Sequence, residues 1–274
     1  MDGAIVVGNW ALPLLYLGLL LDYGATFFLR TRTHVRSAWL PLVIGVHGGM
    51  LALRAVSAGR LPIAGAAEIL SVLALAVAVV YGLVELTSRD RRTGVFVVSL
   101  AFLAQYTSSI LLAGAAGAAA GTGEAASLWG RLHVMPALVS YTAMGFAGVY
   151  GLLYLVAQHD LRERRFGVLF DRLPPLDLLG RMTWHALLVG FIFMTLTIAT
   201  GPLVFGHGMA GGEGAAMTAK IWSKVIAGSG AWLIAAAAIL GRWIGQWPPG
   251  RVAAIAVAGF GVTMALLGAS ALLS

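Results

Sequence analysis

The chain has 274 residues, of which 59% are hydrophobic and 11% are charged, and its mean hydropathy is +0.89. Soluble domains carry roughly 25% charged residues, so this composition excludes an ordinary water-soluble globule and predicts an integral membrane protein. The absence of cysteine excludes thiol-redox relays, iron–sulfur clusters and structural disulfides. The net charge of +7 lies in short segments between apolar blocks, where it sets topology and meets lipid head groups. We therefore expect the lipid bilayer, and not nucleic acid, as a partner.

Apolar blocks of about 20 residues follow one another along the chain, the length that a helix needs to cross a hydrocarbon core of ~30 Å. Backbone groups in lipid must pair within their own segment, so each block is expected to be a helix. The predicted fold class is all-α: a polytopic membrane protein with about eight transmembrane helices, forming a single membrane domain over residues 1–274. The predicted spans are 10–29, 38–56, 68–86, 94–114, 132–157, 183–204, 221–240 and 252–273.

The loops between these spans alternate in charge. One set holds thirteen arginines: Arg30, Arg32, Arg36, Arg89, Arg91, Arg92, Arg162, Arg164, Arg165, Arg172, Arg181, Arg242 and Arg251. The opposite set holds five basic residues: Arg54, Arg60, Arg131, Lys220 and Lys224. Positively charged loops stay in the cytoplasm. The bias predicts a multi-pass protein of the bacterial inner (plasma) membrane with both termini outside.

Four histidines lie in or beside the spans, where an ionisable group is costly and is therefore a candidate for function. His47 lies near the middle of the second span, and His185 lies at the inner end of the sixth. A neutral imidazole within the membrane needs a hydrogen-bond partner or a metal, so His47 is either a satisfied core histidine or an intramembrane ligand. We interpret His185 as structural because it lies so near the boundary.

The other two histidines are predicted at the same outer face. His133 lies at the outer mouth of the fifth span, and His207 lies in the outer loop after the sixth. Two histidines from different helices can hold haem iron axially. A bis-histidine haem site is thus open, and the alternative is that His133 is an interfacial helix-start residue and His207 a loop residue.

The second outer loop, AGRLPIAGAAE, brings Arg60 and Glu68 near Arg54 at the end of the preceding span. Arginines here suit charge-assisted bonds to haem propionates. They equally suit a Glu–Arg bridge that fixes the loop. The sequence leaves both interpretations open.

Motifs for hydrolase or transferase chemistry are missing from the sequence, as are internal repeats. We also find no pair of carboxylates within the spans that would relay protons. Both observations disfavour a small-solute transporter.

Four stretches carry a further pattern. They are LRAVSAGRLPIAGAAEIL at 53–70, WGRLHVMPALVSY at 129–141, GFIFMTLTIATG at 190–201, and residues 220–267 with Trp232, the Gly241–Arg242 pair and the PPGR turn. In this order and spacing they resemble the cytochrome c assembly protein family, the CcsA/CcmC-like haem-handling membrane proteins. The resemblance implies that the histidine of W-x-x-x-H-V, here His133, is an external haem ligand.

The chain also departs from that family. Its haem-transferring members carry a tryptophan-rich segment ending in W-D-P-K-E, where this chain has GPLVFGHGMAGGEGAAMTAK. They also carry a histidine in the span near Arg242 and another after the last span, and this chain has neither. The chain is therefore more similar to the short, HemX-like branch, in which His207 is the outer-loop histidine left to pair with His133.

These observations predict a haem-binding membrane protein that handles or presents haem for cytochrome c assembly. It would act as a carrier or chaperone rather than an enzyme, with haem b as its cofactor and other cytochrome c maturation proteins as partners. The predicted haem-binding residues are His133, His207, His47, Arg54 and Arg60. The alternative is a membrane regulator or scaffold of haem biosynthesis, contacting a cytoplasmic enzyme through the loop 158–182.

Overall fold

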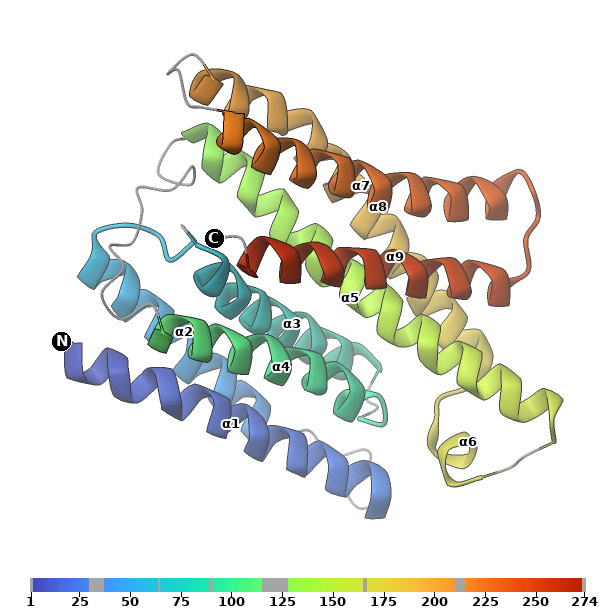
Figure 1. Ribbon diagram of the computed structural model, residues 1–274. Coiled ribbons are helices and arrows are strands. Elements are labelled where there is room, and N and C mark those ends of the chain that lie inside the picture. Colours follow the sequence, from blue (N-terminus) through green and yellow to red (C-terminus); the bar gives the residue numbers. More distant parts are fainter. Residues whose placement is uncertain are drawn as a thin grey trace. The chain divides into compact units, whose positions relative to one another are not determined.

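The structure, a computed structural model, describes residues 2–29, 37–63, 65–88, 91–114, 128–164, 167–209 and 215–272. Only the backbone is described for residues 2, 168–169, 205–209, 215–221, 223–224, 227 and 266–272. Every element in the described residues is an α-helix (Figure 1). The chain forms two compact units, Met1–Ala126 and Ser127–Ser274.

Unit 1 consists of α1 (Asp2–Leu29), α2 (Trp39–Ala58), α3 (Ala66–Ser88) and α4 (Gly94–Gly114). Each helix packs against the next, and α4 packs back against α1, so that the four helices close into a bundle. The short connections make consecutive helices antiparallel. α2 ends at Gly59, whose left-handed conformation (φ 63°) lets the backbone N–H groups of Gly59 and Arg60 bond the carbonyls of Val56 and Ala55.

Unit 2 consists of α5 (Leu128–Arg162), the short α6 (Val168–Arg172), α7 (Leu176–Met209), α8 (Ala215–Trp243) and α9 (Pro249–Leu272). The long α5 is the central helix: it packs along α7 and α9, and α8 covers both of those. Small residues allow this close approach. A Cβ at Gly148 of α5 would collide with Phe260 of α9, and one at Gly190 of α7 would lie 2.9 Å from the sulfur of Met144.

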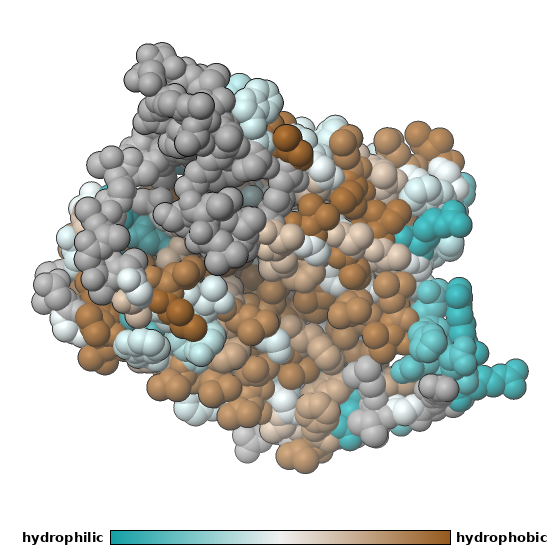
Figure 2. All heavy atoms as spheres, viewed as in Figure 1, coloured by the Kyte–Doolittle hydropathy of each residue, from teal (hydrophilic) through white to brown (hydrophobic). Residues whose placement is uncertain are grey.

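Six described helices are long and apolar enough to cross a membrane, namely α1 to α5 and the Leu176–Val204 part of α7. Hydrophobic residues also cover most of the described surface visible in Figure 2, as expected for side chains that face lipid. The prediction of an all-α, multi-pass membrane protein is confirmed. α8 and α9 coincide with the last two predicted spans, while the count of eight and the sides of the termini stay predictions.

Polar side chains divide the core of unit 1 into three levels. On α1 the buried polar residues Asn9, Tyr16 and Tyr23 recur every seven residues. Seven residues make about two helical turns, so these side chains share one face at steps of ~10.5 Å. We call the levels, after their charged or titratable members, the Arg54 layer (Asn9, Arg54, Ser109), the His47 layer (Tyr16, His47, Ser71, Gln105) and the Arg91 layer (Asp22, Tyr23, Ser37, Glu85, Arg91).

The turn between α8 and α9 explains part of the family-like pattern. The ring of Trp247 lies against Gly241 and Gly245, where a Cβ at either glycine would collide with the indole. The guanidinium of Arg251 lies 5.5 Å from the ring centroid of Trp247, and that of Arg242 lies 5.2 Å from the centroid of Trp184. The G-R pair and the PPGR turn therefore close this turn by ring and cation–π packing.

Candidate functional site

His133 lies in the second turn of α5, half-buried against α7. Its Nδ1 is 3.3 Å from Oγ1 of Thr200. That hydroxyl has one proton, which it donates to the helix carbonyl of Leu196 at 2.9 Å. The hydroxyl therefore accepts a hydrogen bond from Nδ1–H of His133. In this tautomer Nε2 carries the lone pair, which is the form of imidazole that ligates a metal.

His207 belongs by its backbone to the last turns of α7, and its side chain lies outside the described residues. The loop that we predicted here is helical up to Met209. Position 207 is seven residues after Thr200, so it occupies the same stripe of the helix about 10.5 Å further along the axis. The two histidines predicted as a pair are thus carried by α5 and α7, two helices that pack on each other.

Contacts among three helices hold this region in place. Ser140 of α5 donates to the carbonyl of Gly190 in α7 at 3.0 Å. Nε1 of Trp232 in α8 donates to Oγ1 of Thr195 in α7 at 2.8 Å, and its ring stacks on Phe191 at 5.4 Å between centroids. These bonds fix the axial register of α5 and α8 against α7, and with it the position of His133 against Thr200.

His47 is fully buried in unit 1, and both of its ring nitrogens have partners. Ser71 donates to Oε1 of Gln105 at 2.9 Å, so its oxygen accepts from Nε2–H of His47 at 3.0 Å. In a neutral ring with its proton on Nε2, Nδ1 accepts from the hydroxyl of Tyr16 at 3.0 Å; that hydroxyl also lies 3.3 Å from the carbonyl of Ala74. The alternative of a satisfied core histidine agrees with these bonds, and hydroxyl groups of α1 and α3 supply them rather than a helix carbonyl.

The Arg54 layer continues from the His47 layer. Nε2 of Gln105 donates to Oγ of Ser109 at 3.1 Å, and the carbonyl of Ser109 accepts from Nδ2 of Asn9 at 2.9 Å. Oδ1 of Asn9 in turn accepts from Nη2 of Arg54 at 2.9 Å. One run of hydrogen bonds thus joins all four helices of unit 1 from Tyr16 to Arg54.

Arg60 forms a salt bridge with Glu68, one of the two interpretations of the second outer loop. Its Nη1 and Nη2 donate to the two carboxylate oxygens of Glu68 at 2.8 and 2.9 Å. The hydrogen bond to this carboxylate raises the pKa of Arg60 above its ordinary value. The Glu–Arg alternative is therefore confirmed for Arg60, whereas Arg54 bonds to Asn9.

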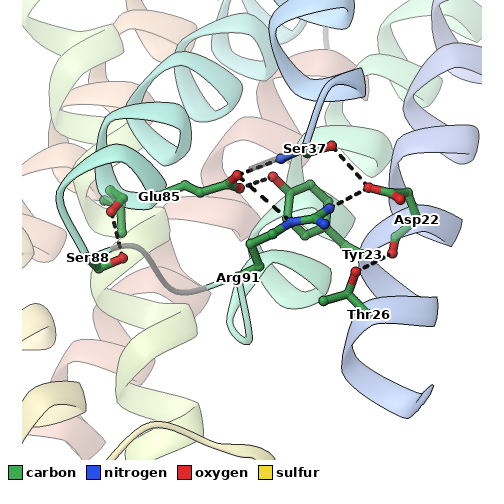
Figure 3. Close-up of polar contacts among 8 residues, drawn as sticks. Asp22, Tyr23, Thr26, Ser37, Glu85, Ser88 and Arg91 are labelled. Atoms are coloured by element: carbon green, nitrogen blue, oxygen red, sulfur yellow. Dashed lines mark hydrogen bonds and ion pairs between the residues drawn. The ribbon is translucent and has the colours of Figure 1, made fainter. Parts of the chain in front are cut away.

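The Arg91 layer was not expected from the sequence (Figure 3). Asp22, inside predicted span 10–29, and Glu85, near the end of predicted span 68–86, both contact Arg91: Nη2 bonds Oδ2 of Asp22 at 2.5 Å, and Nε lies 3.9 Å from Oε1 of Glu85. The guanidinium also lies 4.5 Å from the ring centroid of Tyr23, whose hydroxyl donates to Glu85. Two carboxylates of the predicted spans thus come together as ion pairs with one arginine. The prediction that the spans hold no carboxylate pair for proton relay stays a prediction.

Hydrogen bonds from Ser37 further stabilise the carboxylates of Asp22 and Glu85. The backbone N–H of Ser37 donates to Oε1 of Glu85 at 2.9 Å, and its hydroxyl donates to Oδ2 of Asp22 at 3.0 Å. Burial opposes the charge of Arg91, but the bond to Asp22 and the charges of both carboxylates outweigh it, so the pKa of Arg91 lies above its ordinary value. The layer therefore joins the start of α2 to the facing ends of α1 and α3.

Among the residues that the structure describes, no three histidine, aspartate or glutamate side chains form a group that could hold a metal ion by themselves. A pair of axial histidines does not need such a group. Haem binding by His133, His207, His47, Arg54 and Arg60 stays a prediction.

Comparison with known proteins identifies the chain's relatives at the level of the family. No curated protein and no solved structure matches it. A family model described as cytochrome C assembly protein matches residues 63–273, which include α3 to α9 and the stretches around His133 and Thr200. The match covers more than half of the chain, and the protein belongs to the cytochrome c assembly protein family.

Proposed function

We propose that this membrane protein binds haem b and presents it for cytochrome c assembly, with His133 as one axial ligand. The observation that carries the proposal is the bond from Nδ1–H of His133 to Thr200. Histidines that ligate metals commonly donate their other ring N–H to an oxygen acceptor, which fixes the ring and its tautomer. Both residues lie within the part of the chain that matches the family.

His207 is the proposed second ligand. It follows Thr200 by two turns on the helix that packs against His133, which supports the two histidines acting on one haem. His47 is proposed as a structural residue, because a metal at either ring nitrogen would displace the bond to Tyr16 or Ser71. The protein would work as a carrier, leaving ligation of haem to a maturation partner.

Haem titration of the purified full-length protein tests this proposal. We expect the wild type to give the low-spin absorption spectrum of bis-histidine haem, His133→Ala to abolish it, and His207→Ala to convert it to a high-spin form. Thr200→Val keeps the shape of Thr200 and removes the acceptor, so it should weaken haem affinity by about 10–100-fold.

Two other histidines serve as controls in that titration. His185→Ala removes an exposed histidine of α7, and His47→Gln keeps polar atoms beside Tyr16 and Ser71. Both should leave the spectrum unchanged. A wild type without a haem spectrum, or an unchanged spectrum in His133→Ala, would refute the proposal, and a loss confined to His47→Gln would move the haem site into unit 1.

We also propose eight spans in the bacterial plasma membrane with both termini outside, on the basis of the thirteen-to-five charge bias between alternate loops. Alkaline phosphatase fused after residue 274 should be active, and green fluorescent protein fused there should be dark. Fusions within loop 158–182 should give the opposite pattern. An inactive phosphatase at the C-terminus would show an odd number of spans or an inverted topology.

A further inference from the structure

The guanidinium of Arg54 forms a hydrogen bond through one terminal nitrogen and not through the other. Its Nη2 donates to Asn9 at 2.9 Å, whereas its Nη1 is buried and has no hydrogen-bond partner among the residues that the structure describes. Buried donors are almost always satisfied, because an unsatisfied donor loses the hydrogen bonds that it makes to water, and the loss is largest for a charged group. The unsatisfied nitrogen therefore points to a partner that is not part of the described chain.

The local charge identifies the kind of partner. Glu68, in the first turn of α3, accepts hydrogen bonds on both carboxylate oxygens from Arg60. Within the described residues the three side chains Arg54, Arg60 and Glu68 carry two positive charges and one negative charge, which leaves one positive charge unbalanced. A guanidinium N–H in this position binds oxyanions by charge-assisted hydrogen bonds.

The surroundings indicate an oxyanion carried by an apolar molecule. Arg54 lies one turn before the end of the apolar helix α2. α2 is long and apolar enough to cross a membrane, so Arg54 lies near one end of a span, where anionic lipid head groups meet basic side chains. A ligand with a hydrocarbon part and an anionic head suits a buried cation in this position.

We propose that Nη1 of Arg54 binds the oxyanion of an amphiphile at this end of unit 1. The oxyanion is either the phosphodiester of an anionic phospholipid or the carboxylate of a fatty acid. The site uses Arg54 and Asn9 of unit 1, whereas the proposed axial ligands of haem are His133 and His207 of unit 2. The Arg54 site and the haem site can therefore be tested separately, and failure of one proposal would leave the other unaffected.

Native mass spectrometry of the full-length protein in detergent tests the site with three probes: phosphatidylglycerol, oleate and diacylglycerol. We expect one molecule of at least one anion to be retained, and Arg54→Gln to weaken its retention at least tenfold. Arg54→Lys keeps the charge on a different donor geometry and should lose less. Retention of phosphatidylglycerol alone identifies a phosphodiester site, and retention of oleate alone identifies a carboxylate site.

Arg131→Gln is the matched control, because it removes a charge predicted on the same side of the membrane and lies in unit 2. It should leave retention unchanged. The proposal would be overturned if diacylglycerol were retained as well as the anions, if neither anion were retained, or if Arg54→Gln and Arg131→Gln lost retention equally. The unliganded melting temperature of Arg54→Gln should be no lower than that of the wild type, which separates lost binding from lost fold.

Discussion

Arg91→Gln is expected to lower the free energy of unfolding of unit 1 by ~3–5 kcal/mol, the range for breaking a buried ion pair from one side. The arginine side chain is only 3% exposed, and its loss would leave the carboxylates of Asp22 and Glu85 facing one another without a countercharge. It would also remove the cation above the ring of Tyr23. Detergent-to-SDS unfolding of the purified protein, followed by tryptophan fluorescence or circular dichroism, measures the change.

An exposed arginine provides the comparison for Arg91. Arg181 pairs with Asp177 at 3.4 Å, but their side chains are 63% and 80% exposed, so Arg181→Gln should cost no more than about 0.5 kcal/mol. Adding Asp22→Asn to Arg91→Gln removes one of the two facing carboxylates and should recover part of the loss. Equal effects of Arg91→Gln and Arg181→Gln would contradict a structural role for the Arg91 layer.

Gly148→Leu is expected to destabilise unit 2 by about 3 kcal/mol, the upper part of the usual range for overpacking a core. A Cβ at position 148 of α5 would already overlap the Cβ and ring of Phe260 in α9, so the helices must separate to admit any side chain. The same unfolding measurement detects the loss. Unit 2 should lose stability without a change in the bonds of unit 1.

Gly261 is the matched control, because it follows Phe260 on the same helix and is exposed, and a Cβ added to it would meet no heavy atom within 4 Å. Gly261→Leu should change stability by no more than ~0.5 kcal/mol. Phe260→Ala combined with Gly148→Leu should restore part of the lost stability by making room. If the two glycine variants behave alike, close packing of α5 on α9 is not what requires glycine at 148.

Much of the fold could be predicted from composition and loop charge, because lipid forces apolar segments of sufficient length to be helical. The residues at which the helices begin and end could not be predicted in this way. α1 begins at Asp2, eight residues before the predicted span, and α5 extends to 35 residues where 26 were predicted. Hydropathy measures how much of a helix suits lipid, and helical hydrogen bonding continues beyond that length.

Among the polar contacts of unit 1, those between residues close in the sequence could be predicted, and those between distant residues could not. Arg60 and Glu68 lie eight residues apart in one loop, so their bridge could be anticipated. Asp22 and Arg91 are 69 residues apart, and Asp22 is a single acidic residue inside a strongly apolar block, so the Arg91 layer was missed. The seven-residue spacing of Asn9, Tyr16 and Tyr23 was the available signal, because polar residues on one helix face predict polar partners opposite.

The contact between His133 and Thr200 is a different case. The sequence indicates that His133 is important through its resemblance to the family, but it does not contain the rotation of α5 against α7. That rotation depends on which small residues allow close approach, as at Gly190 beside Met144, and on bonds such as that from Ser140 to the carbonyl of Gly190. The rotation of one helix against another is determined by packing between them, which cannot be read from the sequence of either helix alone.

The polar layers also constrain how the protein enters the membrane during its synthesis. Asn9 bonds to Ser109 and Arg54 to Asn9, so polar groups of the first two helices find part of their partners 100 residues later in the chain. At a synthesis rate of ~5–20 residues per second, that interval lasts roughly 5–20 s. A helix with an unpaired charge or amide is poorly stable in lipid over such a time. We therefore expect α1 and α2 to remain beside the insertion machinery until α4 emerges, and the four helices to be released into the bilayer together.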